Sequence, residues 1–66
     1  MPVGTVTEFA EQPGLGVVTT ADGTTYAFHC AQIADGTRMI DVGQQVRFSP
    51  LARFGSYEAG AVDKIG

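Results

Sequence analysis

Two strong turn signals, Pro13-Gly14 and Asp22-Gly23, lie close together in this chain and limit the segments around them to the length of β-strands. Proline presets one turn dihedral and glycine accepts a positive φ, so each pair favours a chain reversal, and Asp-Gly is typical of a tight hairpin. The flanking segments Val3–Ala10, Leu15–Thr20 and Thr24–Cys30 are rich in β-branched or aromatic residues and too short for independent helices. The sequence therefore predicts three consecutive strands.

Two further strands are predicted in the second half of the chain, at Gln45–Phe48 and Tyr57–Ile65. Proline has no N–H to donate to a sheet, so Ser49-Pro50 is expected to end the first of them. Residues 52–56 are expected to form a loop, and Gly60 is expected to mark a bend in the last strand.

One helical turn and one bulge complete the predicted secondary structure. Ala31–Ala34 has the length of a single helical turn, which Asp35-Gly36 would end. Val6 and Phe9 do not follow strict alternation, which indicates a β-bulge in the first strand. Five short strands in so small a chain favour a closed barrel, because a flat sheet would leave apolar edges exposed. The predicted fold class is all-β, a five-stranded antiparallel Greek-key barrel of the OB-fold type with one short helical turn.

Size, cysteine content and charge narrow the possibilities further. The 66 residues are expected to form one domain, residues 1–66, and a whole small protein. The single cysteine cannot form an internal disulfide, the N-terminal segment does not resemble a signal peptide, and no apolar run is long enough for a membrane span. We therefore expect a cytoplasmic protein. The net charge of −3, with four Lys and Arg against seven Asp and Glu, provides no basic stripe of the kind that binds polyanions.

Several short motifs follow one another along the whole chain. They are Gly4-Thr5-Val6, Phe9, Gly14, Gly16, Val18, Asp22-Gly23, His29, Ile33, Gly36, Gly43 to Phe48 and Ala59 to Val62. By their order and spacing, with almost no gaps, the chain resembles the cold-shock domain family. The stretch from Phe28 to Arg38 is similar to a divergent actinobacterial branch of such small bacterial proteins. The resemblance implies a barrel that binds single-stranded RNA or DNA.

The departures from the family pattern fall on the residues that would hold bases. Members of the family stack bases on aromatic rings of the second and third strands, where this chain has Leu15, Val17 and Ala27. A Lys-Trp pair of the first strand is replaced by Thr7-Glu8, and the lysine before the first glycine is Pro13. The resemblance therefore implies weakened or altered binding of nucleic acid.

Strand alternation predicts where the aromatic residues of the third strand have gone. Side chains along a strand point to alternate faces of the sheet. If His29 takes the outward position that the family motif gives it, Ala27 also faces outward, and Tyr26 and Phe28 point into the barrel.

The resemblance assigns the nucleic-acid-binding face to a small set of side chains. The contact platform would be Phe9, Leu15, Val17, His29 and Tyr57, with Arg38 and Arg53 as the nearest phosphate partners. Two alternatives stay open, because His29 either contacts a base or is a solvated surface histidine, and Tyr57 either stacks on a base or covers one end of the barrel. Phe54 is expected to cover a barrel end.

Two functions of different classes follow from this sequence. The leading one is a cold-shock-like protein that binds single-stranded RNA or DNA weakly, and the alternative is a protein-interaction module that uses an aliphatic outer face. An enzyme is not predicted, because His29 and Cys30 are neighbours on a strand and so face opposite ways. One histidine and one cysteine cannot supply the four ligands of a structural zinc, so we predict no metal and no cofactor.

Overall fold

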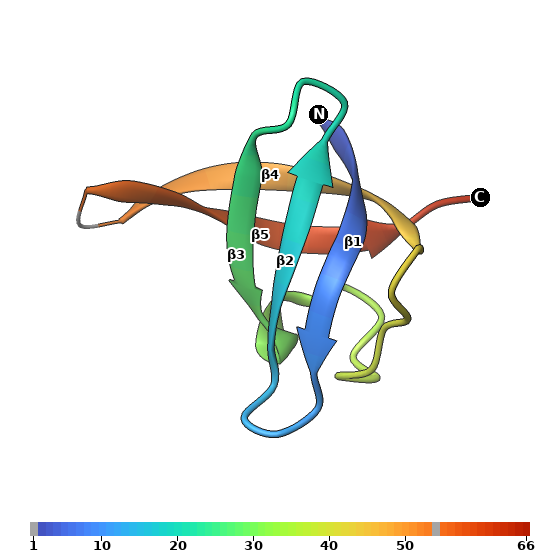
Figure 1. The fold of residues 1–66 in the computed structure, drawn as a ribbon. Coiled ribbons are helices and arrows are strands. Elements are labelled where there is room, and N and C mark those ends of the chain that lie inside the picture. The colour runs from blue at the N-terminus through green and yellow to red at the C-terminus, as the bar shows by residue number, and fades with distance from the viewer. Residues whose placement is uncertain (1, 54) are drawn as a thin grey trace.

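Five strands form a closed barrel in the computed structural model, which describes residues 2–53 and 55–66. The strands are β1 (Val3–Ala10), β2 (Leu15–Thr20), β3 (Thr25–His29), β4 (Gln45–Arg53) and β5 (Ser56–Lys64), and their order around the barrel is β1-β2-β3-β5-β4. Figure 1 shows β1, β2 and β3 side by side, crossed by the long β4–β5 hairpin. This all-β barrel confirms the predicted fold class and is consistent with an OB-fold.

One pair of neighbouring strands in the barrel is parallel, whereas the sequence predicts antiparallel pairing. β3 and β5 run in the same direction and pair at Ala27 and Glu58. The other four pairs are antiparallel among the residues described. Directions cannot alternate all the way around a closed ring with an odd number of strands, so a five-stranded barrel must contain a parallel pair.

The predicted bulge in β1 is confirmed. The register between β1 and β2 shifts between Val6 and Glu8, which leaves Thr7 as the extra residue. The Thr7 hydroxyl lies 2.9 Å from the Thr19 hydroxyl of β2 and forms a hydrogen bond with it. Because of the shift, Val6 is fully buried and Phe9, three residues later, is half-buried on the same side of the sheet.

β4 is longer than predicted, so the prediction that Ser49-Pro50 ends this strand is wrong. β4 pairs with β1 only from Gln45 to Arg47, and beyond that point it pairs with β5 alone. Pro50 therefore lies where no β1 partner needs its missing N–H, and it pairs with Ala59 in the hairpin. The loop predicted at residues 52–56 is correspondingly short, since β5 begins at Ser56.

A single helical turn follows β3, close to where it was predicted. It is a 3-10 helix, η1 (Cys30–Gln32), which begins one residue earlier than the predicted segment Ala31–Ala34. Ile33, at its end, bridges to Val62 of β5, and Ala34 donates its N–H to the Val62 carbonyl at 2.7 Å. These contacts attach the segment after η1 to the barrel.

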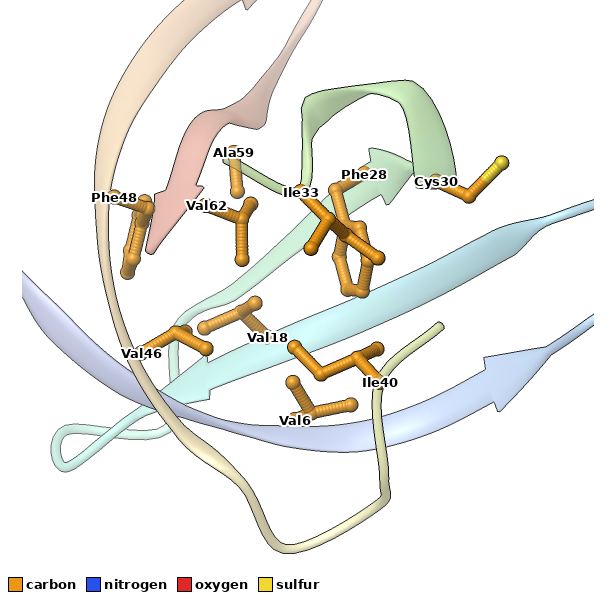
Figure 2. Packing of buried hydrophobic residues seen from close by; sticks show 10 residues of the cluster. All are labelled: Val6, Val18, Phe28, Cys30, Ile33, Ile40, Val46, Phe48, Ala59 and Val62. Carbon is orange, nitrogen blue, oxygen red and sulfur yellow. The ribbon is translucent and has the colours of Figure 1, made fainter. Parts of the chain in front are cut away.

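The barrel interior is filled by side chains from all five strands and from the segments around η1 (Figure 2). Phe28 of β3 and Phe48 of β4 are its largest fully buried members. Tyr26 packs against this core with its ring 4.8 Å from that of Phe48, whereas Ala27 and His29 are exposed. The predicted facing of the β3 residues is therefore confirmed.

Candidate nucleic-acid interface

The outward side chains of β1, β2 and β3 form three rows that run across the strands. We call them the apolar row (Ala10, Leu15, His29), the middle row (Glu8, Val17, Ala27) and the threonine row (Thr5, Thr19, Thr25). Each row follows from the register, since residues opposite one another on paired strands share a face. The rows place Val17 directly beside Ala27, and Leu15 directly beside His29.

A shallow groove of about 560 Å³ lies over the apolar and middle rows. Its lining residues are Glu8, Phe9, Ala10, Leu15, Gly16, Val17, Ala27 and Val42. The groove therefore brings together three of the predicted site residues, Phe9, Leu15 and Val17. Leu15 is 51% exposed and Val42 is 62% exposed, so the groove presents apolar surface to solvent. Sequence reasoning missed Val42, because it lies in a loop with no periodic pattern around it.

Phe9 belongs both to the groove and to the edge of the core. Its ring stacks on the ring of Phe28, with 6.1 Å between centroids and 9° between planes. Gly16 makes room for this stack, because a Cβ added there would lie 2.5 Å from Phe28 Cζ and 2.8 Å from the Glu8 carbonyl oxygen. The part of Phe9 that remains exposed is the aromatic contribution to the groove lining.

His29 caps η1 from the end of the apolar row. Its side chain is exposed, and its Nδ1 accepts the backbone N–H of Ala31 at 3.1 Å. In the neutral imidazole, a nitrogen that accepts a hydrogen bond carries no proton, so this contact fits the tautomer protonated at Nε2. The ring can therefore donate from Nε2 to a ligand while it caps the helix.

Tyr57 lies outside the groove. It is 61% exposed on β5 and pairs with Ala52 near the end of the β4–β5 hairpin. Figure 1 shows this end of the hairpin extending beyond β3. The prediction about Phe54 falls outside the residues that the structure describes.

The two arginines predicted to contact phosphate do not line the groove. Arg53 forms an ion pair with Glu58, with 3.5 Å between Nε and Oε1. Arg38 is exposed in the segment after η1 and has a φ of 60°. Since Glu58 is in register with Ala27, the middle row has Glu8 on one side and Glu58 on the other. The groove lining therefore holds the Glu8 carboxylate and no lysine or arginine, whereas the Glu58 carboxylate beyond it is paired with Arg53.

Two turn carboxylates away from the groove are strongly hydrogen-bonded. The Thr20 hydroxyl and the Thr24 N–H donate to Asp22 and lower the pKa of that carboxyl to about 2. The Lys64 ammonium, 2.8 Å from Asp35, and the Thr37 N–H lower the pKa of Asp35 to about 2 as well. Both carboxyls are solvent-exposed, so hydrogen bonding to the charged form is the main cause.

Residues 2–53 and 55–66 contain no cluster of three or more side chains of the types that hold a metal ion. In the same part of the chain, no helix has the length and apolar character needed to cross a membrane.

Comparisons with known proteins identify the fold. No protein-family model matches the chain, and no curated protein matches it. The solved structure of drosophila Unr CSD456, a cold-shock domain protein, is similar, with a TM-score of 0.81 and 21% sequence identity. The match covers 98% of this chain and 26% of that one, so the chain spans about a quarter of the length of its structural neighbour. At this identity the likeness shows the fold alone, which is that of a cold-shock domain.

Proposed function

We propose that this protein binds single-stranded RNA or DNA weakly, through the groove over the apolar and middle rows. The observation that carries the proposal is an apolar groove in which the outward side chains of Leu15 and Val17 meet the half-buried Phe9, in a barrel of the cold-shock fold. Apolar surface contacts any base. His29, which is in register with Leu15 but does not line the groove, adds a ring that stacks on a base or donates a hydrogen bond.

The magnitude of stacking explains why the proposed binding is weak. Each base that stacks on an aromatic ring contributes about 1–3 kcal/mol, and Leu15, Val17 and Ala27 offer no ring. Three missing stacks amount to roughly 3–9 kcal/mol, of which aliphatic contacts recover a part. A micromolar complex corresponds to only about −8 kcal/mol. We therefore expect dissociation constants above the micromolar range.

A titration with short fluorescent DNA and RNA oligomers tests the proposal. Leu15→Ser should weaken binding by about 1 kcal/mol, roughly fivefold, because it removes apolar contact area from the groove. Met39→Ser is a matched control, since Met39 is 48% exposed and Leu15 is 51% exposed, but Met39 does not line the groove. Absence of binding to any oligomer by the folded protein would rule out this function.

A protein partner is the second candidate, and the charge of the groove favours it. Glu8 lines the groove, while Arg47, Arg53 and Lys64 all lie in ion pairs with carboxylates. A peptide with aliphatic and basic side chains would complement such a surface. Binding of such a peptide that Leu15→Ser weakens, in a protein that binds no oligomer, would favour this candidate.

The cellular setting is also a proposal. We propose a cytoplasmic protein from the actinobacterial branch, on the basis of its single cysteine and of the stretch from Phe28 to Arg38. Fractionation of source cells with an antibody against the protein tests the location.

A further inference from the structure

We infer that Glu8 makes the groove disfavour backbone phosphates, so that a single strand of RNA or DNA binds there more tightly once its phosphate charge is neutralised. This inference rests on the proposed function and specifies which form of nucleic acid the same site accepts. Glu8 would be the residue that determines this specificity.

The first observation is the position of Glu8. Its side chain is exposed, lines the groove and stands in the middle row directly opposite Val17. None of the lining residues is a lysine or an arginine. A single-stranded nucleic acid whose bases contact Val17 therefore brings its phosphates near the Glu8 carboxylate. Phosphate and carboxylate are both negatively charged and repel each other.

The second observation is that none of the four cations of the chain lines the groove, and that three of them lie in ion pairs. Arg53 pairs with Glu58 at 3.5 Å, and Lys64 pairs with Asp35 at 2.8 Å. Arg47 lies 4.0 Å from Asp63. Recruiting any of these cations to a phosphate would leave its carboxylate unpaired, and the whole chain carries a net charge of −3. The field around the groove therefore disfavours a polyanion.

The third observation is that uncharged polar side chains, four threonines and a glutamine, lie next to the groove. A second depression of about 320 Å³ is lined partly by hydroxyl groups and an amide, those of Thr5, Thr7, Thr19, Thr20 and Gln45. Thr5 and Thr19 belong to the threonine row, which directly follows the middle row on the same face. Hydroxyls and amides bind sugars and base edges without requiring a phosphate charge.

These observations predict an unusual dependence on salt. Proteins that contact phosphates with lysine and arginine lose affinity as salt rises, because counterions are no longer released as favourably. Here salt would screen the repulsion between Glu8 and the strand, so the affinity for a charged strand should rise or stay constant.

The test compares two thymidine oligomers of equal length, one with natural phosphodiesters and one with an uncharged methylphosphonate backbone. Binding is measured by fluorescence anisotropy at low salt and at about 0.15 M salt, where screening acts over roughly 8 Å. The methylphosphonate strand should bind more tightly at low salt. Glu8→Gln should raise the affinity for the phosphodiester strand by about two- to fivefold, the range of a single surface charge interaction, and leave the uncharged strand unaffected.

Glu11→Gln is the matched control, because Glu11 is an exposed carboxylate in the turn after β1 that does not line the groove. It should change the affinity for the phosphodiester strand by less than Glu8→Gln does, and it should leave the uncharged strand unaffected as well. Binding of the natural strand that falls steeply with salt and does not respond to Glu8→Gln would overturn the inference and leave the proposed function standing. Failure of both strands to bind would overturn the proposed function as well.

Discussion

Leu15, Val17 and Ala27 present small apolar side chains on the outer face, while Phe28 and Tyr26 turn their rings inward. The family resemblance leads one to expect aromatic rings on the outer face of the sheet. In this chain the outer positions are aliphatic, and the aromatic rings of β3 lie on the inner face. The inner rings serve the core, so the outer positions remain free to vary without loss of packing. This separation makes the binding face accessible to experiment.

Restoring aromatic residues on the outer face should restore affinity. In the triple variant Leu15→Phe, Val17→Phe and Ala27→Phe, each new ring should add about 1–3 kcal/mol to the binding of single strands. The three positions lie on the paired strands β2 and β3, and Val17 is opposite Ala27, so the rings would be neighbours. The measurement is a fluorescence titration against the parent protein, with folding checked by circular dichroism.

Thr25→Phe is the control for the triple variant, because it adds a ring to the same sheet face but in the threonine row, beyond the groove. A folded triple variant that binds no better than this control would show that the missing rings do not explain weak binding. That result would favour the protein partner.

Gly16 should tolerate no side chain. A Cβ at this position would lie 2.5 Å from Phe28 Cζ, so Gly16→Ala should destabilise the protein by about 1–3 kcal/mol through overpacking. Thermal or urea unfolding measures this loss. If the contact with the Phe28 ring is the cause, Gly16→Ala should cost less in a Phe28→Leu background than in the parent. Equal costs in both backgrounds would instead point to the Glu8 carbonyl oxygen, which lies 2.8 Å from the same Cβ.

The residue-level features that sequence could predict are those that depend on alternation. The facing of Tyr26 and Phe28 follows from the period of a strand once His29 is placed outward. Val42 and the ion pair of Arg53 could not be predicted in this way. Both depend on where a loop or a hairpin lies in space, and no local periodicity encodes that position.

At the scale of elements, β4 shows how a local rule is overridden by its surroundings. Proline ends a strand only where its N–H is needed by a neighbour, and at Pro50 the β1 neighbour has already ended. The sequence identified the proline correctly but could not show that this part of β4 pairs on one side only. An exposed strand edge that carries a proline is also protected against pairing with other chains.

The cap of η1 gives a prediction that separates the two roles of His29. His29→Ala removes the acceptor of the Ala31 N–H and should cost about 0.5–2 kcal/mol of stability, the usual effect of losing an N-cap. His29→Asn keeps an acceptor suited to this position, so most of the stability should remain. Chemical unfolding of both variants provides the measurement.

The same pair of variants tests the contact of His29 with a ligand. If the imidazole ring contacts a base, His29→Asn should lose affinity although it keeps the cap. Full affinity in His29→Asn would assign His29 to the cap alone.

At the scale of the whole molecule, stability should decline in acid as two turns lose their hydrogen bonds. The pKa of both Asp22 and Asp35 is lowered from 3.8 to about 2 in the folded protein. A lowered folded pKa contributes stability that is fully present above the unfolded value of 3.8 and is lost as the pH falls through about 2. The Tm should therefore fall across this interval.

Variants identify the groups responsible for the acid transition. Asp22→Asn combined with Asp35→Asn should be less stable at neutral pH and should lose less of its stability between pH 3.8 and about 2. Asp41→Asn is the control, because Asp41 is also exposed and takes part in none of the side-chain hydrogen bonds that hold Asp22 and Asp35. An acid transition unchanged in the double variant would mean that other carboxyls control it.

The closed barrel itself was predictable from the number and length of the strands, but the parallel pair was not inferred from them. Segment lengths and turn signals determine five strands, and exposed edges then favour closure. A parallel pair follows only from the fact that the closed barrel has an odd number of strands. The two remaining junctions, β1–β4 and β3–β5, join strands distant in sequence, which no local motif describes.

Those two junctions also divide the molecule into a part made by β1 to β3 and a part made by the β4–β5 hairpin, each built from neighbours in sequence (Figure 1). The slow kinetic event in such a chain is the encounter of two locally formed pieces, because the segment that links them must first be closed into a loop. Each doubling of the length of that segment should raise the free energy of loop closure by only about 0.6 kcal/mol. This increase should appear as slower folding, while the unfolding rate stays almost unchanged. Stopped-flow measurements on variants with glycine and serine inserted between Ile40 and the exposed Asp41, which leaves the hydrogen bonds between Asp35 and Thr37 intact, would reveal this asymmetry. The barrel would then fold by the docking of two separately formed units, although the folded structure is one closed ring of strands.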